Sequence, residues 1–282
     1  MLPKAVKFPE AVGLKEALEI RREEVRDMVA RFGVISPDRV ILHNYPVSSP
    51  VSVFNASVTY DEKEEALEIF ARVIFGYYMY VSSIVGIRVP INDLFNRYVN
   101  SNRYTGNIVL YSSMKYDVWG TEDPRVHRFG GKLCMTYVGR SINYFNPVLR
   151  RNRTLPITAV YDEDLRTWVK RLVFTLSEEA FGEVISNKDS FLHSASDGSV
   201  FLLHRPHLVD ESYRLMVSPI EDDLLNGGMT IREVKVREGI EVLKPCDFEG
   251  RLGWATPIIR LDDDTLVALV HAVDKDLVVY RV

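Results

Sequence analysis

The chain has 282 residues, of which 46% are hydrophobic and 26% are charged, so it can bury a sizeable core. Its 35 basic and 39 acidic residues give a formal net charge of -4, which argues against a general nucleic-acid binder. The sequence contains no apolar run near the roughly 20 residues that span a bilayer, and its first residues lack a signal-peptide core. We therefore expect a cytoplasmic protein with neither nucleic-acid nor membrane partners.

The cysteine content predicts neither a disulfide framework nor a zinc site, because Cys134 and Cys246 are the only two cysteines. Cys134 is expected to be a small core residue. No metal-ligand spacing and no glycine-rich nucleotide loop occur, so we expect no cofactor. The chain is rich in charged residues and contains no glutamine, a composition that is typical of proteins from thermophiles.

The first predicted element is a helix from Leu14 to Phe32, where apolar residues recur mostly at three- and four-residue steps. Gly33 follows as its expected C-cap. We predict that residues 1–36 form an N-terminal helical extension, packed on the outside or at one end of the body.

Strands are predicted from Val40 to the end of the chain, with turns at Gly130-Gly131, Asp197-Gly198 and residues 262–264. The regions 97–105 and 145–156 read as loops, and the second carries three arginines that could reach a pocket: Arg150, Arg151 and Arg153. No low-complexity linker divides the sequence, so residues 1–282 are predicted to form a single domain.

A unit of about 66 residues recurs along the chain and places polar residues at matching points of successive hairpins. One set of positions is separated by 68, 66 and 66 residues: Asn55, Asp123, Asp189 and Ala255. A second set is separated by 68, 65 and 66 residues: Arg72, Arg140, Arg205 and His271. A fixed period of β-hairpins is typical of the blades of a propeller, which would bring these residues to one central pocket. Carboxylates facing basic groups suit a sugar together with an anion.

Five short motifs accompany this period in a fixed order. They are Phe54-Asn55 with Ala71-Arg72-Val73, Gly120-Thr121-Glu122-Asp123-Pro124-Arg125 with Tyr137, Asn187-Lys188-Asp189, Leu203-His204-Arg205-Pro206, and Gly253-Trp254 with Val270-His271-Ala272-Val273-Asp274. Over roughly residues 50 to 282 they resemble glycoside hydrolase family 130, the phosphorylases and hydrolases of β-mannosides. The resemblance implies an all-β, five-bladed β-propeller with the N-terminal helix outside it.

The resemblance also implies an inverting glycoside phosphorylase, in which Asp123 is the general acid. The acid protonates the leaving oxygen through a sugar hydroxyl, inorganic phosphate attacks the anomeric carbon, and mannose 1-phosphate is released. Because phosphate brings its own charge, such a site needs cations rather than a second carboxylate. The phosphate-binding candidates are Arg72, Arg140, Lys188, His204 and Arg205. The substrate-binding candidates are Asn55, Glu122, Arg125, Asp189, Tyr137 and His271.

Simpler roles are open for several of these residues. Arg125 either binds substrate or braces its loop, His204 either binds phosphate or is a core histidine, and Tyr137 either stacks on a sugar or packs in the core. Glu122 would raise the pKa of the Asp123 carboxyl, whereas Arg125 would lower it. Three other histidines are expected to be structural: His127, His193 and His207.

Three departures from the family pattern limit the resemblance. His193-Ser194 and Val270-His271-Ala272 replace family residues, and the sequence stops inside an expected strand at residues 280–282. We expect the fifth blade either to combine residues 1–50 with this end or to be shortened. The alternatives to a phosphorylase are an inverting β-mannosidase on the same fold and a propeller that only binds carbohydrate or protein. Whether the chain forms a homo-oligomer is left open.

Overall fold

The computed structural model describes residues 7–27, 29–76, 80–143, 146, 148–220, 224–225, 230–262 and 265–282. Within these ranges the chain is mainly β-structure, as predicted, with three short helices and two 3₁₀ turns. The helices are α1 (Leu14–Ile20), α2 (Ile91–Phe95) and α3 (Glu178–Phe181), and the 3₁₀ turns are η1 (Pro37–Arg39) and η2 (Tyr98–Asn100). No helix in the described ranges has the length and apolar character needed to cross a membrane.

Two five-stranded sheets form the first half of the molecule. The first has the order β1-β5-β4-β3-β2 and consists of β1 (Val40–Leu42), β2 (Ser52–Asp61), β3 (Ala66–Ile74), β4 (Ser82–Pro90) and β5 (Tyr104–Leu110). The second has the order β13-β9-β8-β7-β6 and consists of β6 (Thr121–Phe129), β7 (Lys132–Arg140), β8 (Thr154–Asp162), β9 (Thr167–Leu176) and β13 (Arg232–Val236). Each is an antiparallel meander with one extra strand, β1 or β13, added in parallel at its outer edge.

Two further sheets follow. The third has the order β10-β11-β12-β14 and consists of β10 (Val184–Ser194), β11 (Val200–Leu208), β12 (Leu215–Ile220) and β14 (Ile240–Leu243). The fourth has the order β15-β18-β19 and consists of β15 (Glu249–Trp254), β18 (Val270–Asp274) and β19 (Tyr280–Arg281). A small hairpin of β16 (Ile259–Arg260) and β17 (Leu266–Val267) lies between β15 and β18 in the chain.

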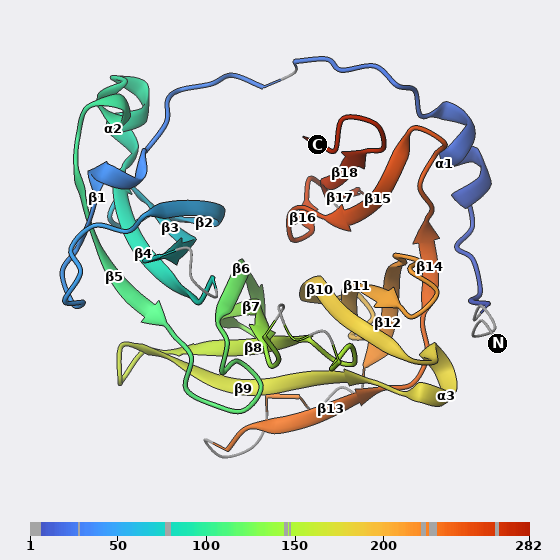
Figure 1. Ribbon diagram of the computed structural model, residues 1–282. Coiled ribbons are helices and arrows are strands. Elements are labelled where there is room, and N and C mark those ends of the chain that lie inside the picture. Colours follow the sequence, from blue (N-terminus) through green and yellow to red (C-terminus); the bar gives the residue numbers. More distant parts are fainter. Residues whose placement is uncertain are drawn as a thin grey trace.

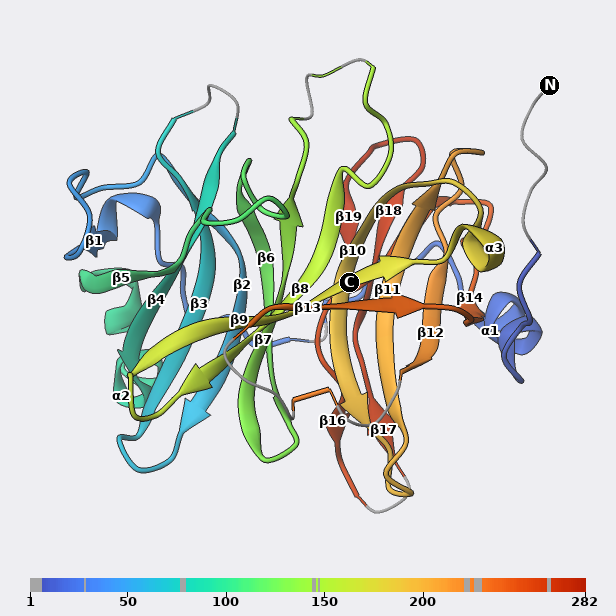
Figure 2. The same cartoon turned by 90° about the horizontal axis from the view of Figure 1, so that it is seen from below.

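The four sheets stand around a common centre like the blades of a propeller, with β2, β6, β10 and β15 innermost (Figures 1 and 2). The prediction of five blades is wrong for the described residues, which form four. Between the first and fourth sheets the ring is open, and the extended chain that follows α1 crosses this side to reach β1 (Figure 1). Residues 7–50 supply β1 and α1 rather than a blade of their own.

Hydrophobic clusters fill the spaces between neighbouring sheets. One lies between the first and second sheets around Met135 and Ile157, and another lies between the second and third around Phe174 and Leu202. A smaller cluster joins the third sheet to the fourth through Phe191 and Trp254. Cys134 is fully buried in the second of these clusters, as predicted for a small core residue. This packing holds the inner strands in fixed positions around the centre.

The predicted N-terminal helix is much shorter than expected, since α1 ends at Ile20 and Arg21 has extended backbone. The apolar side chains that suggested a longer helix are largely exposed, including Val25 and Val29 at 72% and 71%. Short helices in proteins are stabilised mainly by burying an apolar face, and this segment crosses the open side of the ring without one. The side chain of Arg21 instead donates to Glu249 at 2.8 Å and to the carbonyl of Lys244.

The predicted turns at Gly130-Gly131 and Asp197-Gly198 connect β6 to β7 and β10 to β11. All four residues follow turn geometry, and three glycines have positive φ, at 55°, 73° and 90°. Of the predicted turn at residues 262–264, positions 263 and 264 lie outside the described residues, as do positions 145 and 147 of the predicted 145–156 loop. The polar region 97–105 contains η2 and the start of β5 rather than loop alone.

Candidate active site

The repeated polar positions occupy a β-bulge on three of the four inner strands. Strand pairing is interrupted after Phe54, Glu122 and Lys188, so the next residue of each strand is left out of the ladder. Those next residues are Asn55, Asp123 and Asp189, and their φ angles are 50°, 50° and 51°. Asn and Asp tolerate this left-handed conformation better than other residues with a side chain, which explains why they recur there. A bulge re-aims the side chain that it carries.

A cavity of about 720 Å³ lies where these bulges meet. Eight of the predicted site residues line it: Asn55, Arg72, Asp123, Arg125, Lys188, Asp189, Arg205 and His271. They come from all four sheets, so the fold converts a period in the sequence into a single pocket. The fourth repeat position, Ala255, also lines the cavity but follows the end of β15 and carries no polar group.

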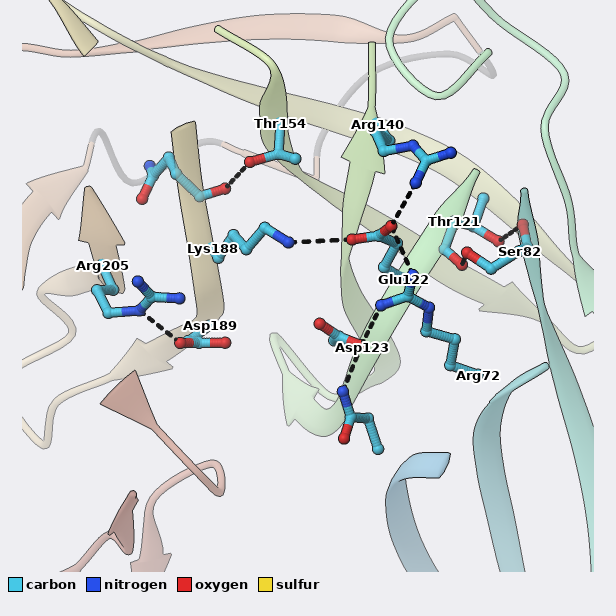
Figure 3. Close-up of polar contacts among 12 residues, drawn as sticks. Arg72, Ser82, Thr121, Glu122, Asp123, Arg140, Thr154, Lys188, Asp189 and Arg205 are labelled. Atoms are coloured by element: carbon cyan, nitrogen blue, oxygen red, sulfur yellow. Dashed lines mark hydrogen bonds and ion pairs between the residues drawn. The ribbon is translucent and has the colours of Figure 1, made fainter. Parts of the chain in front are cut away.

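Asp123 is 9% exposed and sits among polar partners at the cavity wall (Figure 3). Its Oδ1 accepts hydrogen bonds from the side-chain amide of Asn55 at 2.8 Å and from Arg72 at 3.3 Å. Burial raises the pKa of the Asp123 carboxyl, but Arg72, Lys188, the Asn55 hydrogen bond and Arg125 together outweigh it and hold the pKa below its ordinary value. Without a ligand, Asp123 is therefore a carboxylate at neutral pH.

The neighbouring Glu122 points away from Asp123, into a buried cluster of cations (Figure 3). Its Oε1 lies 2.7 Å from Arg72 and 3.4 Å from Arg140, and its Oε2 lies 3.1 Å from Lys188. The Glu122 side chain is fully buried. One carboxylate thus contacts three cations, from β3, β7 and β10. Arg72 and Lys188 also line the cavity, whereas Arg140 lies behind its wall.

Asp189 is the second carboxylate of the cavity and is held by three basic side chains. Its Oδ2 lies 2.7 Å from Arg205 and 3.5 Å from His271, and its Oδ1 lies 3.6 Å from Arg125. Burial raises the pKa of Asp189, but these neighbours outweigh it and keep the pKa far below the usual range. Asp189 is therefore a fixed anion and a weak base.

Gly253 on β15 makes this arrangement possible. A Cβ atom there would lie 2.4 Å from both Asp189 Oδ2 and His271 Nε2, closer than any side chain permits. Arg125 donates to the carbonyls of Asp123, Pro124 and Trp254, at 3.2, 3.2 and 3.1 Å. Arg125 therefore braces its loop, which was one of its two predicted roles. It also lines the cavity.

Four predicted residues do not reach the cavity wall. Glu122 and Arg140 lie behind it in the buried cluster. His204 is fully buried, with its ring nitrogens 3.1 Å from Asn187 Oδ1 and 2.9 Å from Ser218 Oγ, and burial lowers its pKa to about 3. It is a neutral core histidine, so its prediction as a phosphate ligand is corrected. Tyr137 is also in the core, where its hydroxyl donates to Asp117 at 2.8 Å, so the stacking role is corrected too.

Sequence reasoning missed several lining residues at the fourth sheet and the adjacent edge of the third. They are Tyr213, Arg251 and Tyr280, together with His207, which was expected to be structural. The His207 ring stacks on Tyr213, with centroids 4.1 Å apart. None of these residues falls on the repeat positions, so the period carried no signal for them. The arginines of the 145–156 loop are not among the lining residues.

No group of three or more metal-ligating side chains is found among the residues that the structure describes. The cavity instead combines carboxylates, an amide, cations and aromatic rings. Polar groups of these kinds, converging on a pocket at the centre of a propeller-like β-fold, suit a polar ligand such as a carbohydrate.

Comparison with known proteins identifies the family. The family model of glycoside hydrolase family 130, described as beta-1,4-mannooligosaccharide phosphorylase, matches residues 19–282, so the chain belongs to this family. A search of curated protein sequences found no match.

Solved structures share the fold at low sequence identity. The β-1,2-mannobiose phosphorylase of Listeria innocua has a TM-score of 0.57 and 15% identity, covering 82% of this chain and 70% of its own. The α-L-arabinanase of Cellvibrio cellulosa has a TM-score of 0.52 and 14% identity, covering 82% and 72%. An endo-arabinase of Bacteroides thetaiotaomicron has a TM-score of 0.50 and 13% identity, covering 80% and 72%.

Proposed function

We propose that the protein is an inverting glycoside phosphorylase that cleaves β-mannosides with inorganic phosphate and releases mannose 1-phosphate. The observation that carries this proposal is the placement of Asp123 beside Arg72 and Lys188 in one cavity. Arg72 lies 3.3 Å from the Asp123 carboxylate, and both cations line the same wall. A carboxyl group next to cations provides a proton donor and an anion site within reach of one sugar.

The state of Asp189 favours phosphorolysis over hydrolysis. An inverting hydrolase needs a second carboxylate that accepts a proton from water. Asp189 is the other carboxylate among the described side chains of the cavity wall, and its ion pairs with Arg205 and Arg125, beside His271, keep its pKa too low for that role. Phosphate needs no such base, because it arrives with its own negative charge.

In the proposed reaction, a phosphate oxygen attacks the anomeric carbon of the mannosyl unit from the face opposite the leaving group. The bond from the anomeric carbon to the glycosidic oxygen breaks, and the proton of the Asp123 carboxyl passes to that oxygen through a sugar hydroxyl. Phosphate held by Arg72 and Lys188 adds negative charge near Asp123. This charge raises the pKa of the carboxyl in the complex and favours its protonated form.

The test is an assay in the synthetic direction, with mannose 1-phosphate as donor and glucose, N-acetylglucosamine or mannose as acceptor. We expect phosphate release that depends on the acceptor and falls about 10²–10⁴-fold in Asp123→Asn, the usual contribution of a general acid. The matched control is Asp197→Asn, which makes the same change in the exposed turn between β10 and β11.

Two outcomes would overturn the proposal. Cleavage of β-mannosides at equal rates with and without phosphate would identify a hydrolase. Absence of turnover in both directions, with sugar binding retained in Asp123→Asn, would identify a carbohydrate-binding protein.

A further inference from the structure

Arg251 differs from the other arginines of the cavity in its partners. Its guanidinium donates to the hydroxyl of Tyr280 at 2.7 Å and lies over the rings of Tyr213 and Tyr280, at 5.4 and 5.7 Å from their centroids. Among the residues that the structure describes, no carboxylate forms an ion pair with Arg251. By contrast, Arg72, Arg125 and Arg205 each have a carboxylate partner.

The group around Arg251 is held in place before any ligand arrives. Tyr213 is stacked on His207 and bridged to its backbone, so the ring has little freedom. The guanidinium of Arg205 lies over the same Tyr213 ring, 5.1 Å from its centroid. A cation fixed between two aromatic rings loses little conformational freedom when it binds an anion.

The charges of the cavity wall do not balance. Among the described side chains, five cations line it, namely Arg72, Arg125, Lys188, Arg205 and Arg251, against two side-chain carboxylates, Asp123 and Asp189. Behind the wall, the charges of Glu122 and Arg140 cancel each other. A phosphate dianion would offset two of the three excess positive charges. Of the four arginines that line the cavity, Arg251 is the one with no carboxylate partner in the described part of the chain.

Arg251 also lies apart from the residues proposed to hold the reacting phosphate. A row of contacts leads from Asp123 along the wall through Arg125, Asp189, Arg205 and Tyr213 to Arg251. Arg72 and Lys188 lie at the Asp123 end of this row. An anion at Arg251 would therefore belong to the substrate itself, on a sugar that extends along the row.

We infer that the enzyme acts on mannosides whose second sugar carries an anionic group, a carboxylate or a phosphate, which Arg251 binds. This inference rests on the proposed phosphorylase activity for its kinetic test, but not for its binding test. Arg251 then determines substrate specificity without taking part in bond cleavage. The aromatic rings of Tyr213 and Tyr280 orient the guanidinium for two parallel hydrogen bonds to the anion.

The kinetic experiment compares glucose, glucuronic acid and glucose 6-phosphate as acceptors for mannose 1-phosphate. We expect the KM for at least one charged acceptor to be about tenfold or more below that for glucose, as a charge-assisted hydrogen bond allows. Glucuronic acid and glucose 6-phosphate distinguish a carboxylate from a phosphate. In Arg251→Gln the KM for the charged acceptor should rise to about that for glucose in the same variant. Tyr280→Phe removes only the hydroxyl that orients Arg251, so this variant should lose part of the preference for a charged acceptor.

The matched control is Arg88→Gln, which removes a positive charge from the exposed end of β4, away from the cavity. It should leave the preference for charged acceptors unchanged. Equal KM values for charged and neutral acceptors, or an equal loss for both in Arg251→Gln, would overturn the inference while the phosphorylase activity stands.

Calorimetric binding of the same three sugars separates the two proposals if no acceptor is turned over. Tighter binding of a charged sugar, lost in Arg251→Gln, would support the anion site although the proposed reaction had failed. Binding that ignores the charge would overturn the anion site on its own.

Discussion

Asp123 combines a chemical and a conformational demand at one position. Its φ of 50° lies in the left-handed region, and Pro124 follows it at the unpaired position of the bulge, where a missing N–H costs no ladder hydrogen bond. Asn adopts the left-handed region at least as readily as Asp, whereas Ala is strained there by about 1–2 kcal/mol. The choice of substitution at Asp123 therefore decides what an experiment measures.

We predict that Asp123→Ala is less stable than Asp123→Asn by about 1 kcal/mol, although both variants lose the carboxylate charge. The measurement is the free energy of unfolding in urea for the two variants and the unchanged protein. Asp197→Asn and Asp197→Ala provide a matched pair in the turn between β10 and β11, where Asp197 has no positive φ. Equal stability of the two Asp123 variants would contradict a conformational role for the bulge.

At single residues, the sequence predicted the site where the repeat and the chemistry coincide. Asn55, Asp123 and Asp189 share both a period and a residue type suited to the left-handed bulge, and all three line the cavity. His204 belongs to the motif but lies in the core instead of the cavity. Its partners Asn187 and Ser218 could not be predicted from the sequence, because they meet it only in the folded sheet. Arg251 was missed because its importance comes from two tyrosines outside the repeat positions.

The inner strands owe their function to irregularity rather than to regular pairing. The bulges in β2, β6 and β10 re-aim one polar side chain each, whereas β15 ends at Trp254 and its next residue, Ala255, carries no polar group. The fourth sheet instead contributes His271 and Arg251 from positions within its strands. Hairpins could be predicted from alternating patterns and turns, but a bulge leaves no mark in the hydrophobic pattern of a single strand.

The helix α1 is much shorter than its apolar pattern predicts. Three- and four-residue steps of apolar residues continue to Phe32, yet regular helix ends at Ile20 because the following segment has no surface on which to pack. Its path is fixed at one point by the ion pair of Arg21 with Glu249, whose side chains are 21% and 8% exposed.

We predict that Arg21→Ala speeds cleavage by a glutamyl endopeptidase after Glu23 and Glu24, because the segment loses its attachment to β15. A charge-assisted hydrogen bond of this kind contributes about 1.5–3 kcal/mol, so local opening should become at least tenfold more frequent. Limited proteolysis followed by mass spectrometry measures the rate. Arg26→Ala is the matched control, since Arg26 pairs with the exposed Glu24 in the same segment. Similar rates in both variants would show that Arg21 does not anchor the segment.

For the whole molecule, the number of sheets follows the number of repeats. The sequence contains four copies of the repeat, and the described residues form four blades; the fifth blade was implied by family resemblance alone. The all-β class and the central convergence of the inner strands could be predicted, because both follow from a period of hairpins. The open side between the first and fourth sheets could not, since it depends on how the sheets close in space.

The stability of the whole fold should depend on pH through two buried histidines. Burial lowers the pKa of His204 to about 3 and, with smaller effects from nearby groups, that of His127 to about 4. In the unfolded chain a histidine has a pKa of about 6.5. Between these values the unfolded chain binds more protons, so stability falls as the pH falls below about 6.5, by about 1.4 kcal/mol per pH unit for each histidine.

Urea unfolding at intervals from pH 7.5 to pH 5 measures this slope. His204→Gln keeps polar atoms near Asn187 and Ser218 but cannot be protonated. The slope of the unfolding free energy against pH should therefore decrease by about 1.4 kcal/mol per pH unit. His43→Gln makes the same substitution at an exposed histidine and is the matched control. A slope that is the same in His204→Gln as in the unchanged protein would contradict the assignment.

The buried Glu122 gives the empty enzyme its own internal counterion. In the proposed reaction, an incoming phosphate would not meet bare cations, because Arg72 and Lys188 already share the Glu122 carboxylate. Phosphate binding would then be an exchange, in which Arg72 and Lys188 interact with both the Glu122 carboxylate and the phosphate. Such an exchange would disfavour the binding of a monoanion such as chloride and favour the binding of a dianion. It would also favour release of the proposed product, mannose 1-phosphate, because Glu122 stays in place to pair with both cations again.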